Sequence, residues 1–214
     1  MAPAQTSSTS SSSNSAKHLR KPAASTGSAL DAGAVTNGVY RNKALALSYK
    51  IPEGWVLRTD EMNDRDDEVE ENTKPNSAQA PMPPASSAGA KVLLATFSRP
   101  PDARAEEVNS SILIAAESVA NYPGLKDAAQ YFGPLTEVAK AQGLTMDEDP
   151  YEIAVGTKTL VRGDFHKDIG TRVMHQSTLT MLSHGYAISI TVIAGTEDEA
   201  EELIDGLAFN ANGK

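Results

Sequence analysis

The chain has 214 residues, a formal net charge of -9 at pH 7 and no cysteine. The acidic balance disfavours binding to nucleic acid and to anionic membranes, because both need a cationic surface. The absence of cysteine excludes disulfides and thiolate chemistry, and no apolar run approaches the ~20 residues of a membrane-spanning helix.

The first 37 residues are rich in serine and contain no aromatic side chain. Such a segment buries too little apolar surface to offset the entropy lost on ordering. We therefore expect a disordered tail over residues 1–37 and a single folded domain over residues 38–210.

The first five residues show no charged start followed by an apolar segment, as an export signal would. Two alternatives follow. Either the protein is cytoplasmic, or a native export signal that precedes this sequence has been removed. The small residues Ala2, Pro3 and Ala4 ahead of a serine-rich stretch favour an extracytoplasmic protein, and a lipoprotein signal would tether it to a membrane.

A strand over residues 39–41, a turn at Asn42-Lys43 and a strand over residues 44–51 begin the predicted domain. The second strand alternates between its two faces, as a half-buried strand does. Pro52 to Gly54 ends it, because proline cannot donate to the sheet, and Trp55, the single tryptophan of the chain, follows.

Residues 59–90 form an acidic block followed by a block rich in Pro, Ala and Ser, and we expect a flexible insert here. An EF-hand loop that begins at Asp64 would have Val69 at its glycine position and Pro75 at its final glutamate position. A solvated loop is therefore the leading interpretation, and a calcium site is the alternative. The calcium candidates are Asp60, Asp64, Asp66, Asp67, Glu68 and Glu70.

Two continuous apolar runs, over residues 92–98 and 110–116, predict central strands that are covered on both faces. The apolar spacing over residues 125–142 predicts a helix, with a kink or a break after Phe132 because Pro134 removes a backbone donor.

The rest of the chain reads as an antiparallel meander and a last helix. Alternating apolar residues predict strands over residues 151–155, 159–165, 172–182 and 186–194. Thr196 and Glu199 form a capping box ahead of an apolar stripe, so a helix begins here and is expected to end near residues 207–209.

This order of elements resembles that of the PsbP-like and Mog-like superfamily. The resemblance implies an α+β fold, an α/β/α sandwich in which helices flank an antiparallel β-sheet. It also implies an accessory or binding role without a cofactor, and the serine-rich tether is most similar to the exported bacterial members. The matching positions are Tyr40, Leu47, Tyr49, Pro52, Gly54, Trp55, the Gly156 turn, Gly163, Gly185-Tyr186 and the last helix.

No nucleophile elbow, P-loop or dinucleotide fingerprint occurs in the sequence. We therefore predict a non-catalytic module that binds a protein partner, with Trp55, His175 and His184 as candidate contact residues. A calcium-binding protein that uses the acidic block is one alternative. A cytoplasmic enzyme of unknown class, with a site built from Asp164, His166 and His175 in one hairpin, is the other.

Overall fold

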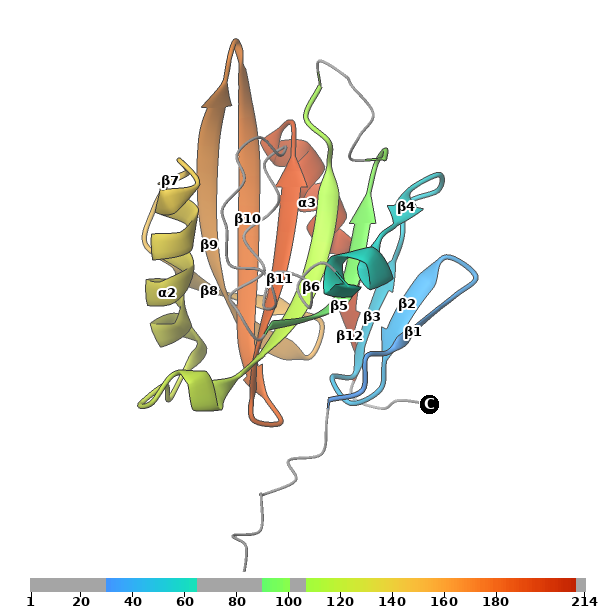
Figure 1. Ribbon diagram of the computed structural model, residues 1–214, viewed down its shortest axis with the longest axis vertical. Helices are drawn as coiled ribbons and strands as arrows, with labels where there is room; N and C mark the ends of the chain where they lie inside the picture. The colour runs from blue at the N-terminus through green and yellow to red at the C-terminus, as the bar shows by residue number, and fades with distance from the viewer. Residues whose placement is uncertain (1–29, 65–89, 101–106, 211–214) are drawn as a thin grey trace, which may run out of the picture.

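The computed structural model describes residues 30–64, 90–100 and 107–210. This part of the chain forms two antiparallel sheets with a few helices packed on them (Figure 1). The small sheet has the order β1-β2-β3-β12, and its strands are β1 (Ala34–Thr36), β2 (Val39–Asn42), β3 (Leu47–Lys50) and β12 (Leu207–Phe209).

The large sheet has the order β4-β5-β6-β11-β10-β9-β7, and β8 also pairs with β9. Its strands are β4 (Val56–Leu57), β5 (Ala90–Phe97), β6 (Ser111–Ser118), β7 (Thr145–Met146), β8 (Tyr151–Val155), β9 (Lys158–Ile169), β10 (Arg172–Ser183) and β11 (Tyr186–Ala194). The predicted central strands are confirmed, because β5 and β6 are buried on both faces over most of their length.

The described helices are α2 (Ala128–Ala141), α3 (Glu197–Asp205), the 3-10 helix η1 (Val119–Asn121) and a helical segment over residues 59–64. The predicted cap of the last helix is confirmed: Thr196 Oγ1 accepts a hydrogen bond from the Glu199 amide at 3.2 Å. The predicted break after Phe132 is wrong, because α2 runs through Pro134. Gly133 has no Cβ to meet the proline ring, which removes part of the usual conflict in a helix.

The predicted fold class, an α/β/α sandwich around one antiparallel sheet, is wrong. The protein is β-rich, and its first strands do not join the main sheet. They pair instead with residues 207–209, which we had expected at the end of the last helix: Leu207 pairs with Tyr49, and Phe209 with Leu47. α3 ends at Asp205 with Gly206 as its C-cap, so the residues that follow can add a fourth strand to the small sheet.

The main hydrophobic core lies between one face of the large sheet and a layer made of the small sheet and α3. In Figure 1 α3 lies behind the strands of the large sheet. α2 covers the opposite face over β9 and β10, where Phe132 packs in a second cluster with Val161 and Phe165. β9 and β10 are therefore buried by α2 on one side and by α3 on the other.

The described part begins before the predicted domain boundary at residue 38. Leu30 is buried in the main core, and β1 pairs with β2 through Ala34 and Arg41. Residues 1–29, which make up most of the predicted tail, and residues 65–89, which make up most of the predicted insert, lie outside the described residues.

Candidate functional site

A polar network lies where β9 and β10 face α3. Residues two apart on a strand share a face, which places Arg162 and Asp164 on the same side of β9, and Ser177 lies directly opposite Asp164 on β10. Arg162 Nε donates to both oxygens of Asp164, at 2.9 and 3.0 Å, and Ser177 Oγ donates to Oδ1 at 2.5 Å. Tyr151 donates its hydroxyl hydrogen to Oδ2 at 2.9 Å.

This network is largely withdrawn from solvent: the side chains of Arg162 and Asp164 are 11% and 19% exposed. Arg162 Nη2 also pairs with Glu201 of α3 at 2.5 Å. Burial alone would lower the pKa of the guanidinium, but Glu201 and Asp164 outweigh it and raise that pKa above its ordinary value. The charge of Asp164 is thus compensated inside the protein, and the carboxylate already accepts several hydrogen bonds.

Tyrosine ionisation should destabilise the fold at alkaline pH. Burial, and then the hydrogen bond to Asp164, raise the pKa of Tyr151 to about 12. Burial also raises the pKa of Tyr40 to about 12, although its hydrogen bond with Asn42 opposes the shift. The folded protein keeps these protons where the unfolded chain has lost them, so stability is full below pH 10 and falls as the pH rises from about 10 to about 12.

Denaturant unfolding followed at several pH values from 8 to 12 checks this expectation. Tyr151→Phe and Tyr40→Phe should each make the fall in the free energy of unfolding less steep across that window. A slope equal to that of the unchanged protein in both variants would contradict it.

The two histidines of the predicted catalytic set lie beside this network. His166 on β9 is directly opposite His175 on β10, so the structure brings both onto the face that carries Asp164. His166 Nδ1 contacts the carboxylate of Asp147, and His175 Nδ1 lies 3.8 Å from Glu197. Asp164 and His175 line a shared cleft of about 260 Å³, but Ser177 donates to Asp164 and makes no hydrogen bond with His175 among the described residues.

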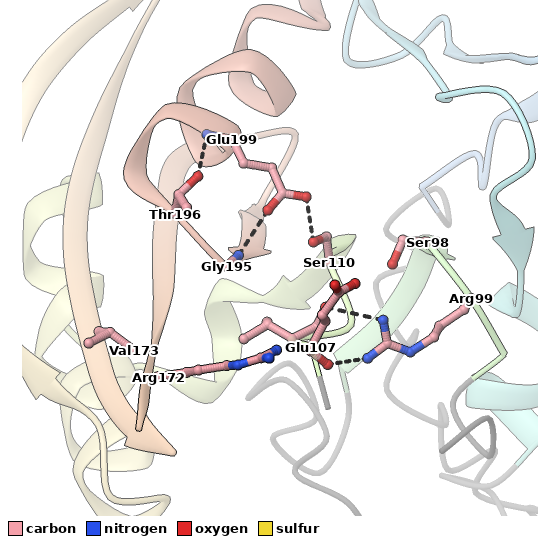
Figure 2. A pocket seen from close by; sticks show the side chains of 10 residues that line it. Ser98, Arg99, Glu107, Ser110, Arg172, Val173, Gly195, Thr196 and Glu199 are labelled. Carbon is pink, nitrogen blue, oxygen red and sulfur yellow. Dashed lines mark hydrogen bonds between the residues drawn. The ribbon is translucent and has the colours of Figure 1, made fainter. Parts of the chain in front are cut away.

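A larger hollow of about 490 Å³ lies at the first turn of α3 (Figure 2). We call it the arginine pocket, because Arg99 after β5 and Arg172 at the start of β10 extend into it from different sides. Its lining residues are Ser98, Arg99, Glu107, Val108, Ser110, Arg172, Val173, Gly195, Thr196 and Glu199.

One of the two acidic residues that line the arginine pocket, Glu199, is held by internal contacts. Glu199 accepts from the hydroxyl of Ser110 at 2.6 Å and from the amide of Gly195 at 2.9 Å (Figure 2). Its carboxylate also lies in the first turn of α3, where the helix dipole favours negative charge. Glu199 thereby fastens the start of α3 to β6 and does not face the pocket as a free anion.

Arg99 keeps donor capacity in the pocket. Its guanidinium donates to the backbone oxygen of Val108 at 3.3 Å and also contacts the backbone oxygen of Glu107. The buried Nε of Arg99, however, makes no hydrogen bond within the described part of the chain. A guanidinium has five N–H donors in a fork that matches a carboxylate or phosphate. Arg99 can therefore donate hydrogen bonds to an anionic oxygen in the pocket.

The predicted contact residues do not form one surface. His175 and His184 lie near opposite ends of β10, nine residues and about 30 Å apart along the strand. His184 sits in the turn to β11 with its Nδ1 2.8 Å from Ser183 Oγ, and the half-buried Trp55 packs against the main core.

The calcium prediction falls mainly outside the described residues. Asp66, Asp67, Glu68 and Glu70 lie there, whereas Asp60 and Asp64 belong to the helical segment over residues 59–64. Within residues 30–64, 90–100 and 107–210, no three His, Asp or Glu side chains stand close enough together to hold one metal ion. No helix among the described elements is long and apolar enough to cross a bilayer.

Sequence reasoning missed the arginines. Arg162 lies two residues before Asp164 on a predicted strand. Residues two apart on a strand share a face, so the sequence could have predicted that these two side chains lie together. Arg99 and Arg172 are 73 positions apart in the sequence, and no local spacing connects them.

No protein-family model and no curated protein matches the chain. Three solved bacterial structures are similar in part. PA94 from Pseudomonas aeruginosa, a protein of unknown function, aligns with a TM-score of 0.34 at 14% identity over 47% of this chain and 69% of its own. A protein of Bacteroides thetaiotaomicron aligns with a TM-score of 0.40 at 11% identity, over 83% of this chain and 50% of its own.

The third structure is LpqN, which is involved in cell envelope biogenesis of Mycobacterium tuberculosis. It gives a TM-score of 0.34 at 15% identity, over 75% of this chain and 76% of its own. The similarities are too distant to assign a family or a function. The resemblance to the PsbP-like and Mog-like superfamily is not confirmed.

Proposed function

We propose that the protein is a non-catalytic binding module that holds a carboxylate-bearing segment of a protein partner in the arginine pocket. The observation that carries this proposal is the pair of guanidinium groups at one hollow, Arg99 and Arg172. A carboxylate that enters the hollow would meet both guanidinium groups, and hydrogen bonds between charged groups are about twice as strong as neutral ones. Arginine is also enriched where protein interfaces are strongest.

The polar network on β9 and β10 supports the non-catalytic part of the proposal. A nucleophilic serine needs a base that takes its proton. Ser177 instead donates to Asp164, whose charge is compensated by Arg162, and His175 lies toward Glu197. These contacts favour a structural role for Ser177 and Asp164.

The proposed location is outside the cytoplasm, with the serine-rich N-terminal segment as the connection to the folded part. Its support is the sequence of that segment, and a cytoplasmic location is the alternative. Fractionation of cells that produce the full-length native protein distinguishes the two.

Selection from a displayed library of random peptides tests the function. We expect the selected peptides to carry Asp, Glu or a free carboxyl terminus, and to bind about tenfold or more weakly to Arg99→Ala and Arg172→Ala, because one charge-assisted hydrogen bond is worth about 1.5–3 kcal/mol. Arg41→Ala, at an exposed position of β2, is the matched control and should bind normally.

Two results would overturn the proposal. The first is selection of peptides whose affinity is the same for the protein and for both pocket variants. The second is measurable turnover by the purified protein on a panel of ester, peptide, glycoside and phosphate substrates that is lost in Asp164→Asn or His175→Ala.

A further inference from the structure

His166 and His175 form a cross-strand pair at the edge of the cleft on the α3 face. They occupy directly opposite positions of β9 and β10, where Cβ atoms lie about 4.5–5.5 Å apart and side chains point to the same face. Both are open to solvent, with side chains 37% and 22% exposed. We propose that the two imidazoles together bind one divalent transition-metal ion of the Zn²⁺, Ni²⁺ or Cu²⁺ class.

The hydrogen-bond partners decide which ring nitrogen is available. A carboxylate only accepts hydrogen bonds, so the His166 Nδ1 that contacts Asp147 carries the hydrogen. In the neutral ring Nε2 then holds a lone pair, and no hydrogen bond to it occurs among the described residues. The carboxylate of Glu197 lies 3.8 Å from His175 Nδ1, beyond hydrogen-bond distance, so it places negative charge near the second ring without fixing its tautomer.

A carboxylate that is hydrogen-bonded to an imidazole often accompanies metal-binding histidines, because it fixes the ring and raises the basicity of the ligating nitrogen; Asp147 is in this position behind His166. Here the two carboxylates come from different elements: Asp147 follows β7, and Glu197 is the first residue of α3. Both also line the cleft, with Glu148 and Glu201, so the surroundings favour a cation.

The chemistry of the ligands sets the kind of ion. Two imidazoles suit Zn²⁺, Ni²⁺ and Cu²⁺ and do not suit Ca²⁺ or Mg²⁺, which prefer oxygen. No third His, Asp or Glu of the described chain stands within reach of the same ion, so water completes the coordination. The site is thus a two-histidine site, and its ligands are not among the residues that line the arginine pocket.

Calorimetric titration of ZnCl₂, NiCl₂ and CuCl₂ into the full-length protein tests the proposal. We expect saturable binding of one ion that a chelator reverses. His166→Ala and His175→Ala should each weaken it at least tenfold, and the double variant should bind little more weakly than either single variant, because both ligands belong to one chelate. Asp147→Asn should weaken binding about tenfold or more by releasing the ring of His166.

His184→Ala is the matched control and should leave the titration unchanged. His184 is an exposed histidine in the turn after β10, and no carboxylate of the described residues contacts it. Circular dichroism and melting of each variant without metal verify that the fold is kept. The proposal fails if the protein shows no saturable binding of any of the three ions. It also fails if binding survives both His166→Ala and His175→Ala, or is lost equally in His184→Ala.

Discussion

Replacing Gly163 by alanine should cost the fold about 3 kcal/mol, because β9 and α2 touch at this position without room for a side chain. A Cβ built on Gly163 would lie 2.4 Å from Cε1 and 3.0 Å from Cδ1 of Phe132. The ring of Phe132 is only 3% exposed and packs in the cluster that holds α2 to the sheet. The ring cannot turn away without opening that cluster.

Thermal and urea unfolding of Gly163→Ala measure this effect. Gly195→Ala is the control, because its new Cβ would make only ordinary contacts, with the nearest atom 3.6 Å away, and its stability should change by less than about 1 kcal/mol. Adding Phe132→Leu to Gly163→Ala should give a smaller loss than the sum of the two single changes, since the smaller side chain relieves the overlap. Strict additivity would contradict the account of this contact.

The second large effect is expected at Arg162. Replacing it by leucine removes the only cation that contacts Asp164 and Glu201 among the described residues, and leaves the largely buried Asp164 carboxylate uncompensated. We expect a loss of about 2–4 kcal/mol in the free energy of unfolding. The double variant Arg162→Leu with Asp164→Leu should regain much of this loss, because an apolar pair of similar size replaces the ion pair without an isolated charge.

The ion pair between Arg58 and Glu61 supplies the control. Its atoms are closer than those of Arg162 and Asp164, at 2.6 Å against 2.9 Å, but Glu61 is 52% exposed, so Arg58→Leu should change stability by less than about 1 kcal/mol. Urea midpoints at neutral pH compare the three variants. If Arg58→Leu and Arg162→Leu lowered the free energy of unfolding equally, burial would not determine the strength of the ion pair between Arg162 and Asp164.

Local patterns predicted much of the chain correctly because each pattern involves residues that are close in sequence. The alternation in residues 151–155 and 186–194 gave β8 and β11 within their observed bounds. Thr196 and Glu199 identified the start of α3. The gap between the predicted strands 172–182 and 186–194 is the observed hairpin turn, where His184 and Gly185 have positive φ.

The arrangement of the two sheets and the helices in layers could not be predicted from local sequence patterns. Phe209 pairs with Leu47, 162 positions earlier in the sequence, and nothing in residues 207–209 distinguishes a helix end from a short strand. The first hairpin has an apolar face that fits either sheet. Its assignment to a separate small sheet depends on this one long-range pairing, and the α/β/α prediction failed there.

The candidate sites also differ in whether local sequence patterns could predict them. The shared face of Asp164, His166 and His175 follows from strand alternation and hairpin register, which local sequence determines. The arginine pocket does not, because it joins the ends of β5 and β10 to the first turn of α3.

Amide chemical-shift mapping of the protein with a selected carboxylate-bearing peptide tests the central claim most directly. The account predicts that the largest shifts fall on Val173, Gly195, Thr196 and Glu199, around the arginine pocket, and that they disappear in Arg172→Ala but not in Arg41→Ala. Shifts that instead gather over the polar network at Asp164 and Ser177, or that persist unchanged in Arg172→Ala, would contradict it.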